Sequence, residues 1–170
     1  VSSPAHAVDR AYAIRVEKEN LKFSAAHFLI FEDGTAERLH GHNYRVAVEL
    51  EANALEHGVI VDFNVVKQQL KALLSMLDER FLVPGRNDLL TWEESDSEIT
   101  VRFDQRRYVA PVDEVVVLPI TNTSSEELAA YLANELLHGL RDVTPATRWS
   151  RIEVSVEETS GQRGLCILRP

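Results

Sequence analysis

The sequence predicts an α+β fold, in which an antiparallel four-stranded sheet carries two helices on one face and an inserted β-hairpin. Segments with the two-residue alternation of half-buried strands lie towards both ends of the chain. Two amphipathic segments with helical spacing lie between them, and a pair of β-like runs separates the two helices. The order strand, strand, helix, hairpin, helix, strand, strand is typical of an α+β domain.

The first half of the sheet is predicted from two strands after a loose tail at residues 1–10. Residues 11–27 are rich in β-formers, and Asp33-Gly34 is a turn signal before the next strand. The alternation at 43–52 is regular, with one predicted face made of Tyr44, Val46, Val48 and Leu50 and the other of Arg45, Ala47, Glu49 and Glu51. A turn and a short further strand are expected in EHGVIVDF, at 56–63.

Two helices and a closing hairpin follow. Residues 64–79 place leucines and valines on one stripe, with Asp62 or Asn64 as the cap. Residues 122–140 form the second amphipathic helix, and Thr123 with Glu126 matches a capping box. The inserted hairpin is expected at about 85–118, and the last two strands surround the turn SGQRG.

Composition limits the class of protein. With 170 residues we expect a single domain covering 1–170, and a net charge of −9 argues against nucleic acid or an anionic membrane as a partner. The chain has one cysteine, Cys166, so no intramolecular disulfide is possible. The first ten residues lack the basic and apolar segments of a signal peptide, which favours a cytoplasmic location.

Two histidines stand two residues apart in the stretch ERLHGHNY, at 37–44. On a strand, residues i and i+2 point the same way, so His40 and His42 would reach one point, and a hairpin would bring His27 beside them. Three neutral imidazoles without a thiolate are typical of a catalytic zinc site with an open fourth position. On spacing alone, the alternative is that His40 and His42 are exposed turn residues and His27 is a core histidine.

Several motifs, in this order, resemble the 6-pyruvoyl-tetrahydropterin synthase family, which includes the 6-carboxytetrahydropterin synthases of queuosine biosynthesis. They are FSAAHFL, LHGHNYRV, GVIVDF, LDERFL, NTSSEELA and VSVEET, and they span residues 23–159. The resemblance implies a tunnelling fold assembled as a homohexamer of two stacked trimers. It also implies zinc bound by His27, His40 and His42, and 7,8-dihydroneopterin triphosphate as the substrate.

Two departures from the family pattern concern catalysis. No cysteine precedes the HGH motif, and Glu37 stands three residues before His40. This resembles the type III branch, in which a glutamate replaces the cysteine and the product is 6-hydroxymethyl-7,8-dihydropterin, a folate precursor. The family's Leu-Asp-His is here Leu77-Asp78-Glu79, so Asp78 is kept and the proton-relaying histidine is replaced by Glu79.

The resemblance also implies substrate contacts. Glu158 would bind the pterin edge, because a carboxylate accepts two parallel hydrogen bonds from an amino group and a ring N–H. Ser124, Ser125 and Glu126 would line the same pocket, although helix capping alone explains Thr123 and Glu126. The candidate cationic contacts for the triphosphate are Lys22, Arg38, Arg45 and Arg163.

These observations favour a zinc-dependent lyase that acts on the side chain of dihydroneopterin triphosphate, with Glu37 as the base. Glu37 has a simpler alternative as a solvated turn residue beside Arg38. Synthesis of a 6-pyruvoyl or 6-carboxy product is the alternative activity. Two alternatives are not enzymes. One is a pterin-binding homologue without catalysis, and the other is a metal-binding domain unrelated to pterins.

Overall fold

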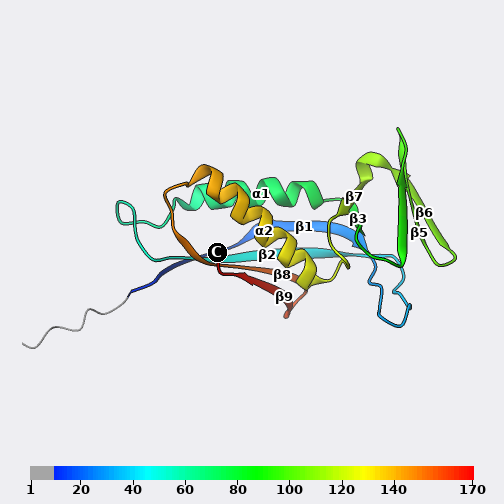
Figure 1. Ribbon diagram of the computed structural model, residues 1–170, viewed down its shortest axis with the longest axis horizontal. Coiled ribbons are helices and arrows are strands. Elements are labelled where there is room, and N and C mark those ends of the chain that lie inside the picture. The colour runs from blue at the N-terminus through cyan, green and yellow to red at the C-terminus, as the bar shows by residue number, and fades with distance from the viewer. Residues whose placement is uncertain (1–9) are drawn as a thin grey trace, which may run out of the picture.

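Six strands form one mixed sheet in the computed structural model, which describes residues 10–170 (Figure 1). In pairing order they are β7 (Val115–Leu118), β3 (Arg80–Pro84), β1 (Tyr12–His27), β2 (His40–Ala52), β8 (Trp149–Thr159) and β9 (Gln162–Leu168). The tail predicted at 1–10 lies, apart from its last residue, outside the described residues.

The antiparallel core of the sheet is confirmed, but the count of four strands is wrong. β1 pairs with β2, β2 with β8 and β8 with β9, all antiparallel, whereas β3 pairs with the free side of β1 and β7 with β3, both in parallel. Both added strands are short and mostly buried. Parallel strands covered on both faces are continuous apolar runs without alternation, which explains why the sequence pattern predicted no strand at 80–84 and placed 115–118 in the inserted hairpin.

The insertion contains more than a hairpin. β5 (Glu98–Phe103) and β6 (Arg106–Pro111) do pair as a hairpin, and β4 (Leu90–Glu94) adds to β5, which makes a separate three-stranded sheet. A 3-10 turn, η1 (Val112–Glu114), then leads into β7. The short strand predicted in 56–63 is absent from the described structure, which has only an isolated bridge between Glu56 and Val59 there.

Both helices lie on the same face of the six-stranded sheet (Figure 1). In α1 (Phe63–Leu77), the side chain of Asp62 accepts from the amide of Asn64 at 2.7 Å, as one of the two predicted caps. In α2 (Ser125–Val143), the cap is Ser124, which accepts from the amide of Glu127. The predicted capping box was therefore wrong by one residue, because Thr123 is buried and bonded elsewhere.

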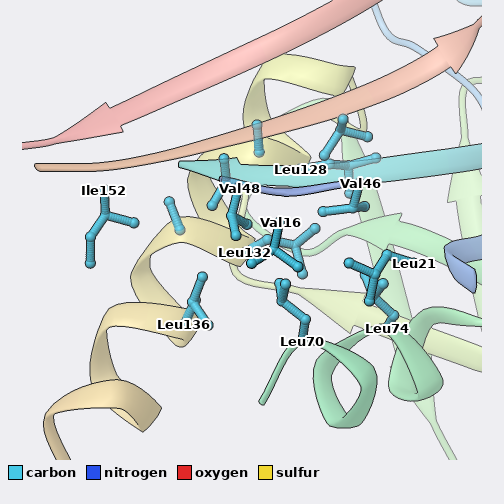
Figure 2. Packing of buried hydrophobic residues seen from close by; sticks show 14 of the residues in the cluster. Val16, Leu21, Val46, Val48, Leu70, Leu74, Leu128, Leu132, Leu136 and Ile152 are labelled. Carbon is cyan, nitrogen blue, oxygen red and sulfur yellow. The ribbon is translucent and has the colours of Figure 1, made fainter. Parts of the chain in front are cut away.

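The main core fills the space between the sheet and the helices (Figure 2). Val46 and Val48 of β2 face Leu70 of α1 and Leu132 of α2, and all four side chains are almost fully buried. A second apolar cluster lies beneath the inserted sheet and includes Phe28, Ile30, Phe81 and Phe103. No helix within residues 10–170 is both long and apolar enough to cross a membrane.

Truncation of the core should destabilise the protein in proportion to burial. Leu70 is 0% exposed, so Leu70→Ala should lower the free energy of unfolding by about 2–5 kcal/mol. Met76 lies in the same helix but is 56% exposed, so Met76→Ala should change it by less than about 0.5 kcal/mol. Urea denaturation of both variants measures the difference, and equal effects would contradict this assignment of the core.

Candidate metal centre and active site

The face of β2 that packs in the core continues, towards the start of the strand, as a row of polar side chains. His40, His42 and Tyr44 occupy the same face as Val46 and Val48, because each is two residues from the next. Tyr44 is fully buried, His42 partly buried and His40 the most exposed of the three. The candidate site therefore lies at the end of the hydrophobic core, on the side of the sheet that the helices cover.

The register of the β1–β2 hairpin brings the third histidine to the same place. His27 pairs directly with His40, and their ring centroids are 4.7 Å apart. The rings of His40 and His42 are separated by 4.8 Å. One ligand atom from each of His27, His40, His42 and Glu158 can be chosen so that all lie within 4.8 Å of one another. The three predicted ligands thus converge, and Glu158 joins them from β8.

The hydrogen bonding of His27 leaves one ring nitrogen for a ligand. Nδ1 lies 3.0 Å from the carbonyl oxygen of Thr123, and because a carbonyl can only accept, Nδ1 carries the hydrogen. Burial lowers the pKa of His27, which favours the neutral ring with a lone pair on Nε2. That buried Nε2 faces Glu158 Oε1 at 3.1 Å without a hydrogen bond. The lone pairs of His27 Nε2 and Glu158 Oε1 repel each other at this distance, and a cation bound between them would remove the repulsion.

The other two histidines point to the same conclusion. His40 Nδ1 donates to the carbonyl of Arg38 at 2.7 Å, which leaves its Nε2 as an acceptor. His42 Nε2 lies 3.3 Å from Glu158 Oε1. Imidazole nitrogens fixed by backbone carbonyls, together with one carboxylate, form a donor set suited to zinc. The residues present therefore fit the predicted metal.

Glu158 differs from the expectation of an open fourth position. Its Oε1 is in the ligand cluster and also accepts from the hydroxyl of Tyr44 at 3.4 Å. Burial, and then the nearby Glu158 carboxylate, raise the pKa of Tyr44 well above its ordinary value, so its hydroxyl remains a donor. Tyr44 and Thr123 are site residues that the sequence analysis missed. The alternation beyond HGH could have indicated Tyr44, whereas the contact of Thr123 joins distant segments.

Glu37 lies beside the ligand cluster, in the loop between β1 and β2. Its Oε2 accepts from the amide of Leu29 at 3.1 Å, and its own amide donates to the carbonyl of Leu29 at 3.0 Å. The same Oε2 is 3.9 Å from His40 Nε2. The side chain is 35% exposed, so this carboxylate is held in place but open to a substrate.

Asp78 and Glu79 do not join the ligand cluster of their own chain. Asp78 ends α1, and its carboxylate accepts from the amide of Ser24 at 2.7 Å, which is a structural role. Glu79 has a left-handed backbone with φ of 57° and lines a pocket shared with His42 and Asn43. Of the two, Glu79 borders a pocket that the candidate ligand His42 also lines.

The residues predicted to bind the pterin are at the start of α2. Thr123, whose carbonyl holds His27, directly precedes Ser124 and Ser125, which are partly buried, and Glu126, which is exposed. Strand β9 packs closely on this turn, since a Cβ at Gly164 would lie 2.4 Å from the amide nitrogen of Glu126. The first turn of α2 is therefore fixed between β9 and the ligand cluster.

The four candidate cations are not equivalent. Arg163 is paired with Glu17 at 3.2 Å and with Glu157 at 2.5 Å, so its charge is already neutralised. Lys22, Arg38 and Arg45 are exposed, and Lys22 lies directly opposite Arg45 in the pairing of β1 with β2. Arg45 also lines a pocket with His42 and Glu158, which makes it better placed than Arg163.

Comparison with known proteins finds similarity over most of the chain. Residues 15–165 match the family model described as 6-pyruvoyl tetrahydropterin synthase. A protein of Methanocaldococcus jannaschii provisionally named 6-carboxy-5,6,7,8-tetrahydropterin synthase is 34% identical over 86% of this chain and 88% of that protein.

Two solved structures have nearly the same fold. The Plasmodium vivax 6-pyruvoyltetrahydropterin synthase, in the structure of its E37A catalytic residue mutant, superposes with a TM-score of 0.86 at 28% identity, over 95% of this chain and 100% of that one. The Plasmodium falciparum 6-pyruvoyl tetrahydropterin synthase gives the same TM-score and identity over 94% of this chain and 99% of that one. The chain therefore belongs to the 6-pyruvoyl tetrahydropterin synthase family.

Proposed function

We propose that this chain is a zinc-dependent lyase that acts on the side chain of 7,8-dihydroneopterin triphosphate and releases 6-hydroxymethyl-7,8-dihydropterin. The observation that carries the proposal is the carboxylate of Glu37, 3.9 Å from His40 Nε2. The single cysteine, Cys166, pairs with Val154 in the β8–β9 hairpin and is not in the ligand cluster. A carboxylate rather than a thiol is therefore the base available beside the histidines.

A zinc ion held by His27, His40 and His42 would act as a Lewis acid towards the oxygens of the substrate side chain. Glu37 takes the proton from the hydroxyl on the second side-chain carbon. The bond between the first and second carbons then breaks, and its electron pair moves into the pterin ring. A proton returned to the first carbon gives the hydroxymethyl product, and the remaining carbons leave as an aldehyde that carries the triphosphate.

The similar proteins point to different products. The Plasmodium vivax enzyme was solved as an E37A catalytic residue mutant, so a glutamate is catalytic in that protein. The provisional name of the Methanocaldococcus jannaschii relative favours instead a 6-carboxy product. Synthesis of a 6-carboxy or 6-pyruvoyl product therefore remains the second candidate, and a pterin-binding homologue without catalysis is the third.

Product analysis separates these candidates. The protein loaded with zinc is incubated with 7,8-dihydroneopterin triphosphate, and the pterins are identified by mass. We expect 6-hydroxymethyl-7,8-dihydropterin, one zinc per chain by metal analysis, and no product after chelation. A 6-carboxy or 6-pyruvoyl product would move the assignment to the synthases, and bound but unchanged substrate would indicate a binding protein.

His40→Ala should lower the zinc content, since it removes one of three imidazole ligands.

The roles of the two glutamates can be tested by matched amide substitutions. Glu37→Gln should lower turnover by roughly 10²–10⁴-fold and leave zinc and pterin binding nearly intact, because it removes only the basic oxygen. Glu158→Gln should weaken pterin binding first, because an amide cannot accept both hydrogen bonds. Glu32→Gln, an exposed change in the same loop as Glu37, is the control.

Two results would change these assignments. Wild-type turnover in Glu37→Gln would reduce Glu37 to a turn residue and make Glu79 of a neighbouring subunit the next candidate. Loss of zinc from Glu158→Gln, without a separate loss of pterin affinity, would identify Glu158 as a metal ligand only.

We further propose that the chain assembles as a homohexamer of two trimers. Strands β7 and β9 end the sheet within residues 10–170, and unpaired strand edges favour pairing with another chain. Sedimentation equilibrium at micromolar concentration should give the mass of six chains. A stable monomer would contradict both the assembly and any role for a neighbour's carboxylate.

A further inference from the structure

One arginine joins the inserted three-stranded sheet to the loop that carries Glu37. Arg106 is the first residue of β6, and its guanidinium donates to two consecutive backbone carbonyls. One nitrogen donates to the carbonyl of Glu37, and the other donates to the carbonyl of Ala36 at 3.1 Å. The insertion therefore reaches across almost seventy positions of sequence to the loop beside the ligand cluster.

The guanidinium is itself held by the second apolar cluster. It lies 5.7 Å from the ring centroid of Phe103, its cross-strand partner at the turn between β5 and β6. Phe103 is buried against Phe28, whose ring centroid is 6.1 Å away and which directly follows His27. Planar guanidinium groups stack favourably on aromatic rings, so the donor fork approaches the loop from a fixed direction.

The backbone that Arg106 holds controls two groups of the candidate site. Three carbonyls in succession have a partner, since those of Ala36 and Glu37 accept from Arg106 and that of Arg38 accepts from His40 Nδ1. Glu37 also exchanges two hydrogen bonds with Leu29. A rotation of the peptides at 36–38 would therefore move both the Glu37 carboxylate and the ring of His40.

We propose that Arg106 is a positioning residue, which fixes the loop at 36–38 so that the Glu37 carboxylate and the His40 ring keep their places beside the ligand cluster. The inserted sheet thus supports the active site rather than serving only as a surface addition. The inference rests on the proposed role of Glu37.

Arginine suits this role better than lysine. Its planar fork presents two nitrogens to two neighbouring acceptors, whereas a lysine ammonium is a point charge on a flexible stem. Arg106→Lys would keep the charge but lose the fork. The comparison of Arg106→Lys with Arg106→Met therefore separates geometry from charge.

The test compares Arg106→Met with Arg107→Met, because Arg107 is the exposed neighbour on the same strand. Hydrogen exchange is measured at the amides of Leu29 and Glu37, which depend on the loop. In Arg106→Met we expect this exchange to accelerate by roughly tenfold or more, the change that corresponds to loss of a hydrogen bond from a charged donor. The amides of β5 and α1 should exchange as in the wild type, as should all of these amides in Arg107→Met.

Kinetics then connect the loop with catalysis. With zinc in excess, Arg106→Met should lower kcat by roughly 10- to 100-fold with little change in KM, because a small displacement of a catalytic group has a large effect on rate. Arg106→Lys should lower kcat to a similar extent, since lysine lacks the planar pair of donors. Added to Glu37→Gln, Arg106→Met should cause little further loss of kcat, because both act through one carboxylate.

The outcomes distinguish this inference from the proposed function. Unchanged exchange at Leu29 and Glu37, or faster exchange with wild-type kcat, would overturn the positioning role. Full activity in Arg106→Lys would overturn the argument from the fork. Faster exchange in Arg106→Met together with wild-type turnover in Glu37→Gln would leave the loop anchored but remove Glu37 as the base. Faster exchange throughout the chain would mean that Arg106 only stabilises the fold, which also overturns the proposal.

Discussion

The pairing of β1 with β2 is the constraint on which the rest of the structure depends. Because side chains alternate between faces and each residue has a defined partner, the register that places His27 opposite His40 also places both on the helix side of the sheet. A shift of one residue would turn the ligands and the core residues of a strand to the other face together. The same hydrophobic burial that sets the register of the core therefore assembles the candidate metal centre.

The two faces of the sheet have different roles as a result. The helix side is apolar as far as Tyr44 and then becomes a row of imidazoles closed by Glu158. The open side carries ion pairs, among them those of Arg151 with Glu49 and Glu51 at 2.8 and 3.0 Å. A half-solvated antiparallel sheet commonly has such a polar face.

The insertion changes how the end of this sheet is supported. β3 and β7 widen the sheet beside β1, and the three-stranded sheet buries a second apolar cluster over Phe28, Ile30 and Phe81. These residues follow His27 and Glu79 in the chain, so the cluster covers segments that lead directly out of the site. A loop such as 31–39 has few apolar contacts of its own and relies on neighbouring elements for a fixed conformation.

Local pattern determined the four antiparallel strands and both helices, because strand alternation and helical spacing depend on residues near in sequence. The convergence of the three histidines was predicted from their spacing together with the family resemblance. Only the tertiary structure decided what depends on distant contacts. The contact of Glu158 with His27, the hydrogen bond from His27 to Thr123, and the hold of Arg106 on the Glu37 loop join residues that are 131, 96 and about 70 positions apart. The buried parallel strands β3 and β7 were not predicted as part of the main sheet for a related reason. Strands covered on both faces lose the alternation that marks a strand in the sequence.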